Sequence, residues 1–299
     1  MPKYYPVFLL AVFLTSCSVN SKSVPSMFWS KIGDGIQFGI SGIALVDTDN
    51  DRSNFVIVHD NKNSDEDRLG IVSVSSDKEP NYLPLAWPND TELPKDLEAI
   101  SKVPGSNPPS FLAGTSRGNI YDLTMNSERN ISILKVFDLP EHPENSNFEG
   151  LALQEIDGQL LMVWTHRGQD SDPGIIYWGT LDAKNYEIKP QGSVEFTVPW
   201  PTELVRHISD IKIDPSGTLY ITSATDPGND GPFSSAVYIA GVFTVNDSEF
   251  EFRANSELAA LYRFDDHKIE AIELIPGTNG GVIFGTDDEN KGSSIYTSF

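Results

Sequence analysis

The chain has 299 residues, 39% of them hydrophobic and 21% charged, so it can bury a sizeable core and does not have the composition of a disordered protein. Its formal net charge of −22 argues against nucleic acid as a partner, because so acidic a surface repels a phosphate backbone. The same charge is compatible with cation binding, or with solubility alone.

The N-terminus predicts a signal peptide over residues 1–16. Lys3 supplies a positive charge, and the apolar run from Val7 to Leu14 is too short to span a bilayer. The sequence Leu14-Thr15-Ser16-Cys17 resembles the lipobox of bacterial lipoproteins, and Cys17 is the only cysteine of the chain. That resemblance implies cleavage before Cys17 and a diacyl anchor on its thiol. An ordinary signal peptide that ends near an accidental cysteine is the alternative.

Further expectations follow for the mature chain. Two acyl chains are enough for stable membrane attachment. Ser18, where inner-membrane lipoproteins carry Asp, implies the outer membrane by the habit of that family, with the protein facing the periplasm. We expect residues 17–27 to be the lipidated cysteine and a flexible tether, and residues 28–299 to form one monomeric domain.

From Phe28 onward the sequence indicates strands. Short runs rich in Val, Ile, Phe, Tyr and Leu are broken by Gly, Asn, Asp or Pro, and helical periodicity is weak and confined to residues 255–262. The runs fall into five groups, one per repeat: 42–46, 54–59, 70–74 and 82–86; 98–103, 110–115, 119–123 and 132–137; 149–154, 159–165, 174–179 and 193–198; 210–214, 218–223, 236–243 and 261–264; 270–275, 281–285 and 293–297.

A motif marks the start of each group. An acidic residue and a small residue lead into an alternating strand, except in the first, degenerate copy, which has Ser41 in place of the acid. The key positions are Ser41, Glu98, Glu149, Asp210 and Glu270, separated by 57, 51, 61 and 60 residues. Self-similarity at such a period is typical of a propeller. We therefore predict an all-β, five-bladed β-propeller, in which residues 28–38 supply the strand that the last repeat lacks and close the ring. A six-bladed ring is the alternative.

The repeated acids predict a site on the propeller axis. The first strand of each blade lines the central channel, so Glu98, Glu149, Asp210 and Glu270 are expected to converge near one end of it, with Asp96, Asn147 and Lys268 on the same side. Four carboxylates at one level need a cation, basic partners or protons. Ca²⁺ suits such oxygen ligands. The alternative is that each acid accepts hydrogen bonds from the backbone of the neighbouring blade.

Loops after the second strands are expected to surround this channel mouth. They are polar and acidic, and loops on a rigid scaffold commonly carry function. The loops concerned are 58–62, 165–170, 225–231 and 286–290. Candidate catalytic residues near the acids are His207, His267, Lys268 and Arg167.

Several motifs resemble the phytase-like or esterase-like β-propeller group. They are the blade starts Leu97-Glu98-Ala99-Ile100, Phe148-Glu149-Gly150-Leu151-Ala152 and Lys268-Ile269-Glu270-Ala271-Ile272, together with Tyr262-Arg263-Phe264 and Gly285-Thr286-Asp287-Asp288-Glu289. The whole chain is also similar to uncharacterised cyanobacterial lipoproteins, which imply no activity. The first resemblance implies calcium-assisted hydrolysis of phosphate or carboxylic esters, with Glu98, Glu149, Asp210 and Glu270 as ligands.

Two functions are therefore expected from the sequence. The first is a membrane-anchored lipoprotein whose propeller binds a small ligand or a protein at an acidic, calcium-compatible channel mouth, because no recognised pairing of nucleophile and base is present. The second is a calcium-dependent phytase-like or esterase-like hydrolase, in which a bound water is activated by the metal.

Overall fold

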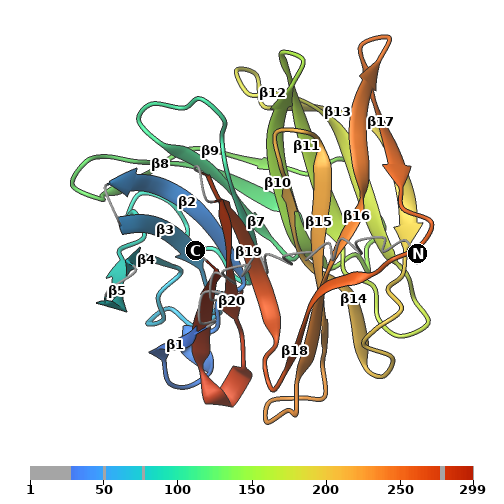
Figure 1. The fold of residues 1–299 in the computed structure, drawn as a ribbon. Coiled ribbons are helices and arrows are strands. Elements are labelled where there is room, and N and C mark those ends of the chain that lie inside the picture. Colours follow the sequence, from blue (N-terminus) through green and yellow to red (C-terminus); the bar gives the residue numbers. More distant parts are fainter. Residues whose placement is uncertain (1–27, 50–51, 76–77, 277–279, 299) are drawn as a thin grey trace, which may run out of the picture.

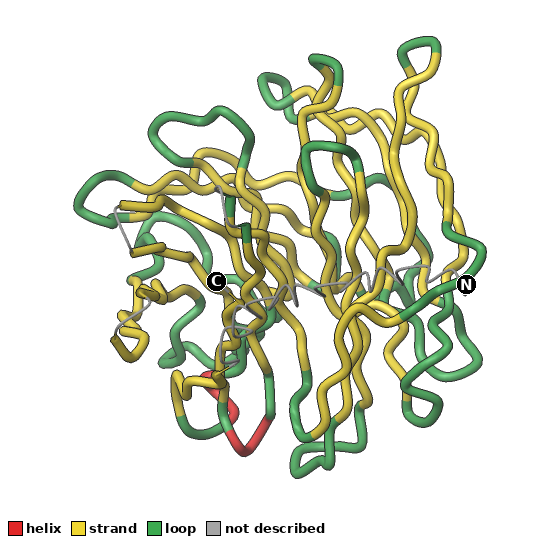
Figure 2. The backbone as a smooth tube through the Cα atoms, viewed as in Figure 1, coloured by secondary structure: helices red, strands yellow, loops and turns green. Residues whose placement is uncertain are grey.

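The computed structural model describes residues 28–49, 52–75, 78–276 and 280–298. The predicted signal peptide (1–16), the lipidation site Cys17 and the tether (17–27) lie outside the described residues. Strands dominate the described chain, and loops join them (Figure 2). No helix in these ranges is both long enough and apolar enough to cross a membrane.

The strands form five antiparallel sheets (Figure 1). Blade 1 is β2 (Gly42–Asp49), β3 (Arg52–Val58), β4 (Leu69–Ser75) and β5 (Lys78–Leu85); blade 2 is β6 (Leu97–Lys102), β7 (Ser110–Thr115), β8 (Asn119–Met125) and β9 (Ile131–Asp138); blade 3 is β10 (Phe148–Ile156), β11 (Gln159–His166), β12 (Gly174–Asp182) and β13 (Glu187–Phe196). The first strand of each blade is the innermost, and β2, β6, β10, β14 and β19 contact one another around the axis.

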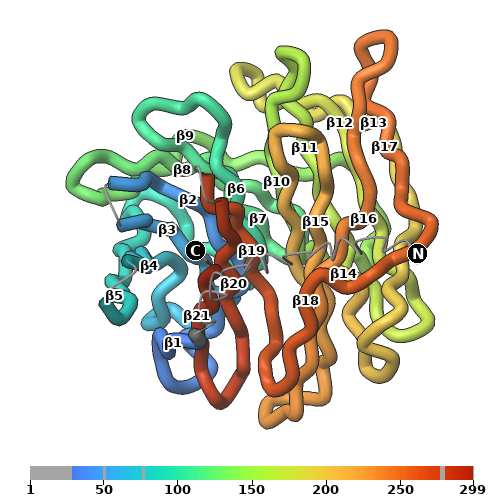
Figure 3. Tube along the Cα trace, viewed as in Figure 1, coloured from blue at the N-terminus to red at the C-terminus, as the bar shows by residue number. Residues whose placement is uncertain are grey.

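Blade 5 closes the ring with the N-terminal strand, as predicted. It consists of β19 (Ile269–Ile275), β20 (Gly281–Thr286), β21 (Ser293–Ser298) and, outermost, β1 (Phe28–Gly33). Figure 3 shows the blue first strand beside the red last one, and Trp29 lies opposite Tyr296 in the register. The remainder of the predicted closing segment includes a short 3₁₀ helix, η1 (Ile36–Phe38), and a second one, η2 (Glu289–Lys291), precedes β21. The chain is a five-bladed β-propeller.

Blade 4 departs from the predicted four strands. It contains β14 (Val205–Ile213), β15 (Thr218–Thr225), β16 (Ser234–Asn246) and β17 (Glu249–Ala254), while the strand expected near 261–264 is β18 (Ala260–Asp265). Because β16 has 13 residues, β18 pairs with its first half and β17 with its second. Asp247 and Ser248 join β16 to β17 with positive φ at both positions, as a two-residue hairpin turn requires.

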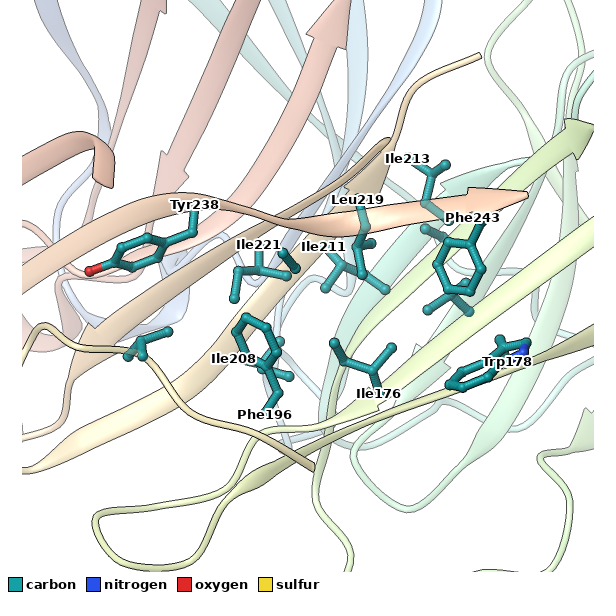
Figure 4. Packing of buried hydrophobic residues seen from close by; sticks show 14 of the residues in the cluster. Ile176, Trp178, Phe196, Ile208, Ile211, Ile213, Leu219, Ile221, Tyr238 and Phe243 are labelled. Carbon is teal, nitrogen blue, oxygen red and sulfur yellow. The ribbon is translucent and has the colours of Figure 1, made fainter. Parts of the chain in front are cut away.

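The hydrophobic core lies between the blades. Each of five buried clusters joins two neighbouring blades, so both faces of a blade are covered. Figure 4 shows the cluster between blades 3 and 4, where Ile176 and Trp178 face Ile211, Ile221 and Phe243. This burial on both faces explains the nearly continuous apolar runs in the middle strands, and it holds the inner strands rigidly around the axis.

Candidate functional site

Three of the predicted acids lie at equivalent β-bulges. Glu98, Glu149 and Glu270 each occupy the position where the register of an inner strand shifts against its neighbour. A bulge re-aims the side chain of the extra residue. All three glutamates are buried, and the Coulomb interactions that act on Glu98 include those from Glu149 and Glu270. The structure therefore brings these three carboxylates together, as the sequence predicted.

Asp210 does not join them. When the repeats are aligned on the apolar pair that flanks the motif, Ser209 occupies the glutamate position, and Asp210 matches Gly42, Ala99, Gly150 and Ala271. Its carboxylate accepts hydrogen bonds from the amide of Ile211 at 2.7 Å and from the amide of Ile272, in the next blade, at 2.8 Å. Asp210 thus bridges blades 4 and 5, the alternative role that the sequence left open.

The positions that match Asp210 are small for a packing reason. A Cβ on Gly42 would lie 3.0 Å from the amide nitrogen of Ile100 and 3.1 Å from the Cα of Ala99, because the inner strands come close here. In blade 4 the Asp210 carboxylate fills the corresponding space. Burial raises the pKa of Asp210 well above its usual value, although the bonds from Ile272 and Ile211 act in the opposite direction.

Two serines complete the ring of equivalent positions. Ser41 stands in blade 1 and Ser209 in blade 4, with exposed fractions of 1% and 0%. Neither hydroxyl has a hydrogen-bond partner among the described residues. The ring at the channel mouth thus reads Ser41, Glu98, Glu149, Ser209 and Glu270 in blade order.

Cations form ion pairs with the carboxylates on one side of the mouth. Arg206 contacts Glu270 at 2.8 Å, Asp226 at 2.7 Å and Glu149 at 4.0 Å. Arg167 lies 3.3 Å from Glu149. We call this the paired side; it comprises Glu149, Arg167, Arg206, Asp226, Lys268, Glu270, Asp287 and Glu289.

Lys268 is the second buried cation of the paired side. It is 1% exposed and contacts Glu289 at 2.6 Å, Glu270 at 3.2 Å and Asp287 at 3.3 Å. Burial alone would lower the pKa of Lys268, but the charges of Glu270 and Asp287 reverse the effect and raise it. Lys268 is therefore held as a permanent cation, which makes it unsuitable as a base at neutral pH.

On the other side of the mouth, two of three carboxylates form no ion pair with a described residue. Asp60, Asp96 and Glu98 each place one carboxylate oxygen within 4.8 Å of the others. Lys62 contacts Asp96 at 2.7 Å, but Asp60 and Glu98 have no hydrogen bond or ion pair with any residue that the structure describes. We call Asp60, Lys62, Asp96 and Glu98 the open side.

The two predicted histidines lie away from the axis. His207 is buried, accepts a hydrogen bond from the amide of Val198 at 3.3 Å and bonds the carbonyl of Asp170 at 2.9 Å. His267 stacks on Trp29 and bonds Asp288 at 2.7 Å. Both imidazoles are thus occupied in holding loops, whereas the predicted Arg167 and Lys268 do reach the mouth.

Sequence reasoning missed one central residue. Arg206 contacts three carboxylates, yet it lies in an irregular stretch of β14 where three residues, 207–209, stand between the paired positions Arg206 and Asp210. Arg206 lies three residues before Ser209, at a position where the repeats share no residue type. By contrast, Asp60, Asp226, Asp287 and Glu289 all come from the loops that were expected to surround the mouth.

Burial shifts the carboxyl groups toward protonation. It raises the pKa of Glu98 well above its usual value, with a further contribution from Glu149. It raises the pKa of Glu149 to about 7, although Arg206 opposes the change, and that of Asp60 to about 6. The mouth can therefore hold and release protons near neutral pH, and it can accept positive charge in their place.

No protein-family model matches this chain, and no curated protein matches it in sequence. Solved structures match its fold. The GH32 β-fructofuranosidase of Bombyx mori has a TM-score of 0.55 at 13% identity, over 90% of this chain and 61% of that one. An endo-1,4-β-xylanase of Bacteroides thetaiotaomicron has a TM-score of 0.53 at 10% identity, over 89% and 92%. The sucrose-6-phosphate hydrolase of Lactobacillus gasseri has a TM-score of 0.51 at 11% identity, over 88% and 68%.

These similarities concern architecture. At identities of 10–13%, what the chain shares with these proteins is the propeller fold. The residues at the channel mouth must carry any functional conclusion on their own.

Proposed function

We propose that this protein is a binding protein whose channel mouth takes up a small cationic ligand on the open side. The observation that carries the proposal is Glu98, a carboxylate 8% exposed that forms no hydrogen bond or ion pair with any described residue and lies beside Asp60 and Asp96. A buried carboxylate is energetically costly unless it is paired or protonated. A positively charged ligand supplies the missing partner, and this interaction favours its binding.

The unpartnered hydroxyl of Ser41 supports the same proposal. Ser41 is buried at the ring position next to Glu98, and its hydroxyl has no hydrogen-bond partner among the described residues. The open side therefore contains a second polar group whose hydrogen bonds the described chain does not satisfy. Calcium is the simplest occupant, and an organic ammonium is the other.

The test is a thermal-shift and equilibrium-dialysis survey of the purified full-length protein with Ca²⁺, Mn²⁺, putrescine and spermidine. We expect at least one of these cations to bind saturably at one equivalent and to raise the melting temperature. Matched anions, such as citrate and inorganic phosphate, should do neither. Absence of binding by all four cations would remove the proposal.

We further propose that a diacyl group on Cys17 holds the protein at the periplasmic face of the outer membrane. The lipobox-like sequence before Cys17 supports this. The C17A variant should move from the membrane fraction to the soluble fraction of cells. Retention of C17A at the membrane would contradict the anchor and leave the binding proposal untouched.

Hydrolysis is the second candidate, and Glu149 favours it. A carboxyl group with a pKa of about 7 is partly protonated at neutral pH and can serve as a general acid. The motif resemblance implies calcium-dependent ester hydrolysis, and the proteins of similar fold carry the names of hydrolases. The test is turnover of p-nitrophenyl esters and glycosides with and without Ca²⁺, where activity that E149Q abolishes would favour this candidate over simple binding.

A further inference from the structure

We infer that Asp60, Asp96 and Glu98 form a divalent-cation site, with calcium as the best-fitting class of ion. This inference rests on the proposed function and names the ligand of the open side. It differs from the ligand set expected from sequence, because only Glu98 is common to the two.

The separation of the three carboxylates fits one ion. Ca²⁺ takes oxygen ligands at about 2.3–2.6 Å, so two oxygens on one ion are at most about 5 Å apart. One oxygen from each of Asp60, Asp96 and Glu98 lies within 4.8 Å of the other two. The three groups can therefore contact a single ion without a change of backbone.

The burial of Glu98 is an independent indication of a ligand. A cluster of exposed acids is ordinary, but Glu98 is 8% exposed and comes from the bulge of an inner strand rather than from a loop. None of the described residues offers its carboxylate a donor. The neighbouring ring residue, Ser41, is 1% exposed and its hydroxyl is also unpartnered.

The paired side cannot hold the same ion. Glu149 and Glu270 already contact guanidinium or ammonium groups at 2.8–3.3 Å, and the buried Arg206 and Lys268 would repel a divalent cation. Removing these cations from their carboxylates would leave buried charges uncompensated. The geometry therefore separates one site for an ion from one in which the glutamates already form ion pairs.

Lys62 acts as the resident counter-ion. Its side chain is 62% exposed and contacts Asp96 alone among the carboxylates, at 2.7 Å. An exposed ion pair of this kind contributes little to stability and exchanges readily. A divalent ion that binds Asp96 displaces the ammonium group of Lys62, which then points into the solvent. Lys62 therefore competes with the ion for Asp96.

Calorimetric titration of the full-length protein with CaCl₂ and MnCl₂ at low ionic strength tests this site. We expect one ion per chain, with E98Q and D96N each weakening the affinity at least about tenfold. E289Q, which changes a carboxylate on the paired side, should stay within about twofold of the wild type. K62M should bind several-fold more tightly, because the competing ammonium is gone.

The outcomes separate the inference from the function on which it rests. Wild-type affinity in both E98Q and D96N, confirmed as folded by circular dichroism, would overturn the site. So would binding of spermidine or putrescine without binding of either metal, and in that case the proposed function stands. If neither metals nor polyamines bind the wild-type protein, both fall.

Discussion

The two sides of the channel mouth are made from the same residue type in the same structural position, and they differ in what neutralises them. Glu149 and Glu270 on the paired side contact Arg167, Arg206 and Lys268, whereas Glu98 on the open side contacts no cation of the described chain. An equivalent backbone position thus carries a structural ion pair in two blades and an unpaired carboxylate in a third. The difference shows that repeat position fixes where a side chain points, while its neighbours fix what it does.

Removal of Arg206, the central cation of the paired side, should cause the largest loss of stability. R206M leaves Glu149, Glu270 and Asp226 without a shared partner, and loss of one member of a buried ionic network costs about 3–5 kcal/mol. We expect that loss in the free energy of unfolding at pH 7.5, measured by urea denaturation. The control is R117M at an exposed arginine, which should stay within about 0.5 kcal/mol of the wild type.

The pH dependence of R206M provides a second readout. Burial already gives Glu149 a pKa of about 7, and removal of Arg206 raises it further. A carboxyl whose folded pKa exceeds its unfolded pKa destabilises the fold increasingly as pH rises between the two values. The deficit of R206M should therefore shrink from pH 7.5 to pH 5, and an equal deficit at both pH values would contradict the role given to Arg206.

The bridge between blades 4 and 5 should be the next largest effect. D210A leaves the buried amides of Ile272 and Ile211 without an acceptor, and each such loss costs about 1–3 kcal/mol. We expect a loss of about 2–6 kcal/mol of unfolding free energy with unchanged cation binding. E155A, at the exposed end of another inner strand, serves as the control. Loss of cation binding in a folded D210A protein would show that Asp210 is part of the cation site.

Removal of the unpaired carboxylate on the open side should raise the free energy of unfolding rather than lower it. In cation-free buffer at pH 7.5, E98Q removes a buried carboxylate that has no hydrogen-bond or ion-pair partner among the described residues, so we expect a gain of about 1 kcal/mol in stability, a usual size for such a change. Burial raises the folded pKa of Glu98, so the gain should vanish near pH 3, where the carboxyl is protonated in both states. A clear destabilisation by E98Q would show that its carboxylate has a stabilising partner.

A further effect is the proton linkage of cation binding. A cation competes with the protons held by Asp60, whose pKa is about 6, and by Glu98, whose pKa is also raised. Each of the two groups gives up its proton when the ion binds, so the affinity should increase more than about tenfold between pH 5 and pH 6 and level off above the pKa values. Titrations at pH 5, 6, 7 and 8 measure this change, and a flat profile would exclude these two groups as ligands.

The sequence was sufficient for the architecture. A motif that returns every fifty to sixty residues predicted five blades, and a repeat one strand short predicted the closing role of the N-terminal strand. The prediction was wrong in blade 4, where β16 is long enough to pair with two outer strands, β17 and β18, rather than with one. No local pattern in residues 249–265 indicates which half of β16 each partner takes.

The site was predicted in part, and the error has a definite cause. Alignment of the repeats on their acidic residues placed Asp210 with the glutamates, whereas alignment on the flanking pair Ile208 and Ile211 would have placed Ser209 there. Packing of the apolar residues between blades sets the register, so the apolar positions are the better guide. The contacts of Arg206 could not be predicted, because they depend on an irregular stretch of β14.

The most direct test of the open side as a cation site is the anomalous diffraction of crystals of this protein soaked in MnCl₂. We expect one anomalous peak at the channel mouth, within about 2.5 Å of oxygens from Asp60, Asp96 and Glu98. A peak among Glu149, Arg206 and Glu270, or a mouth without a peak at saturating Mn²⁺, would contradict it.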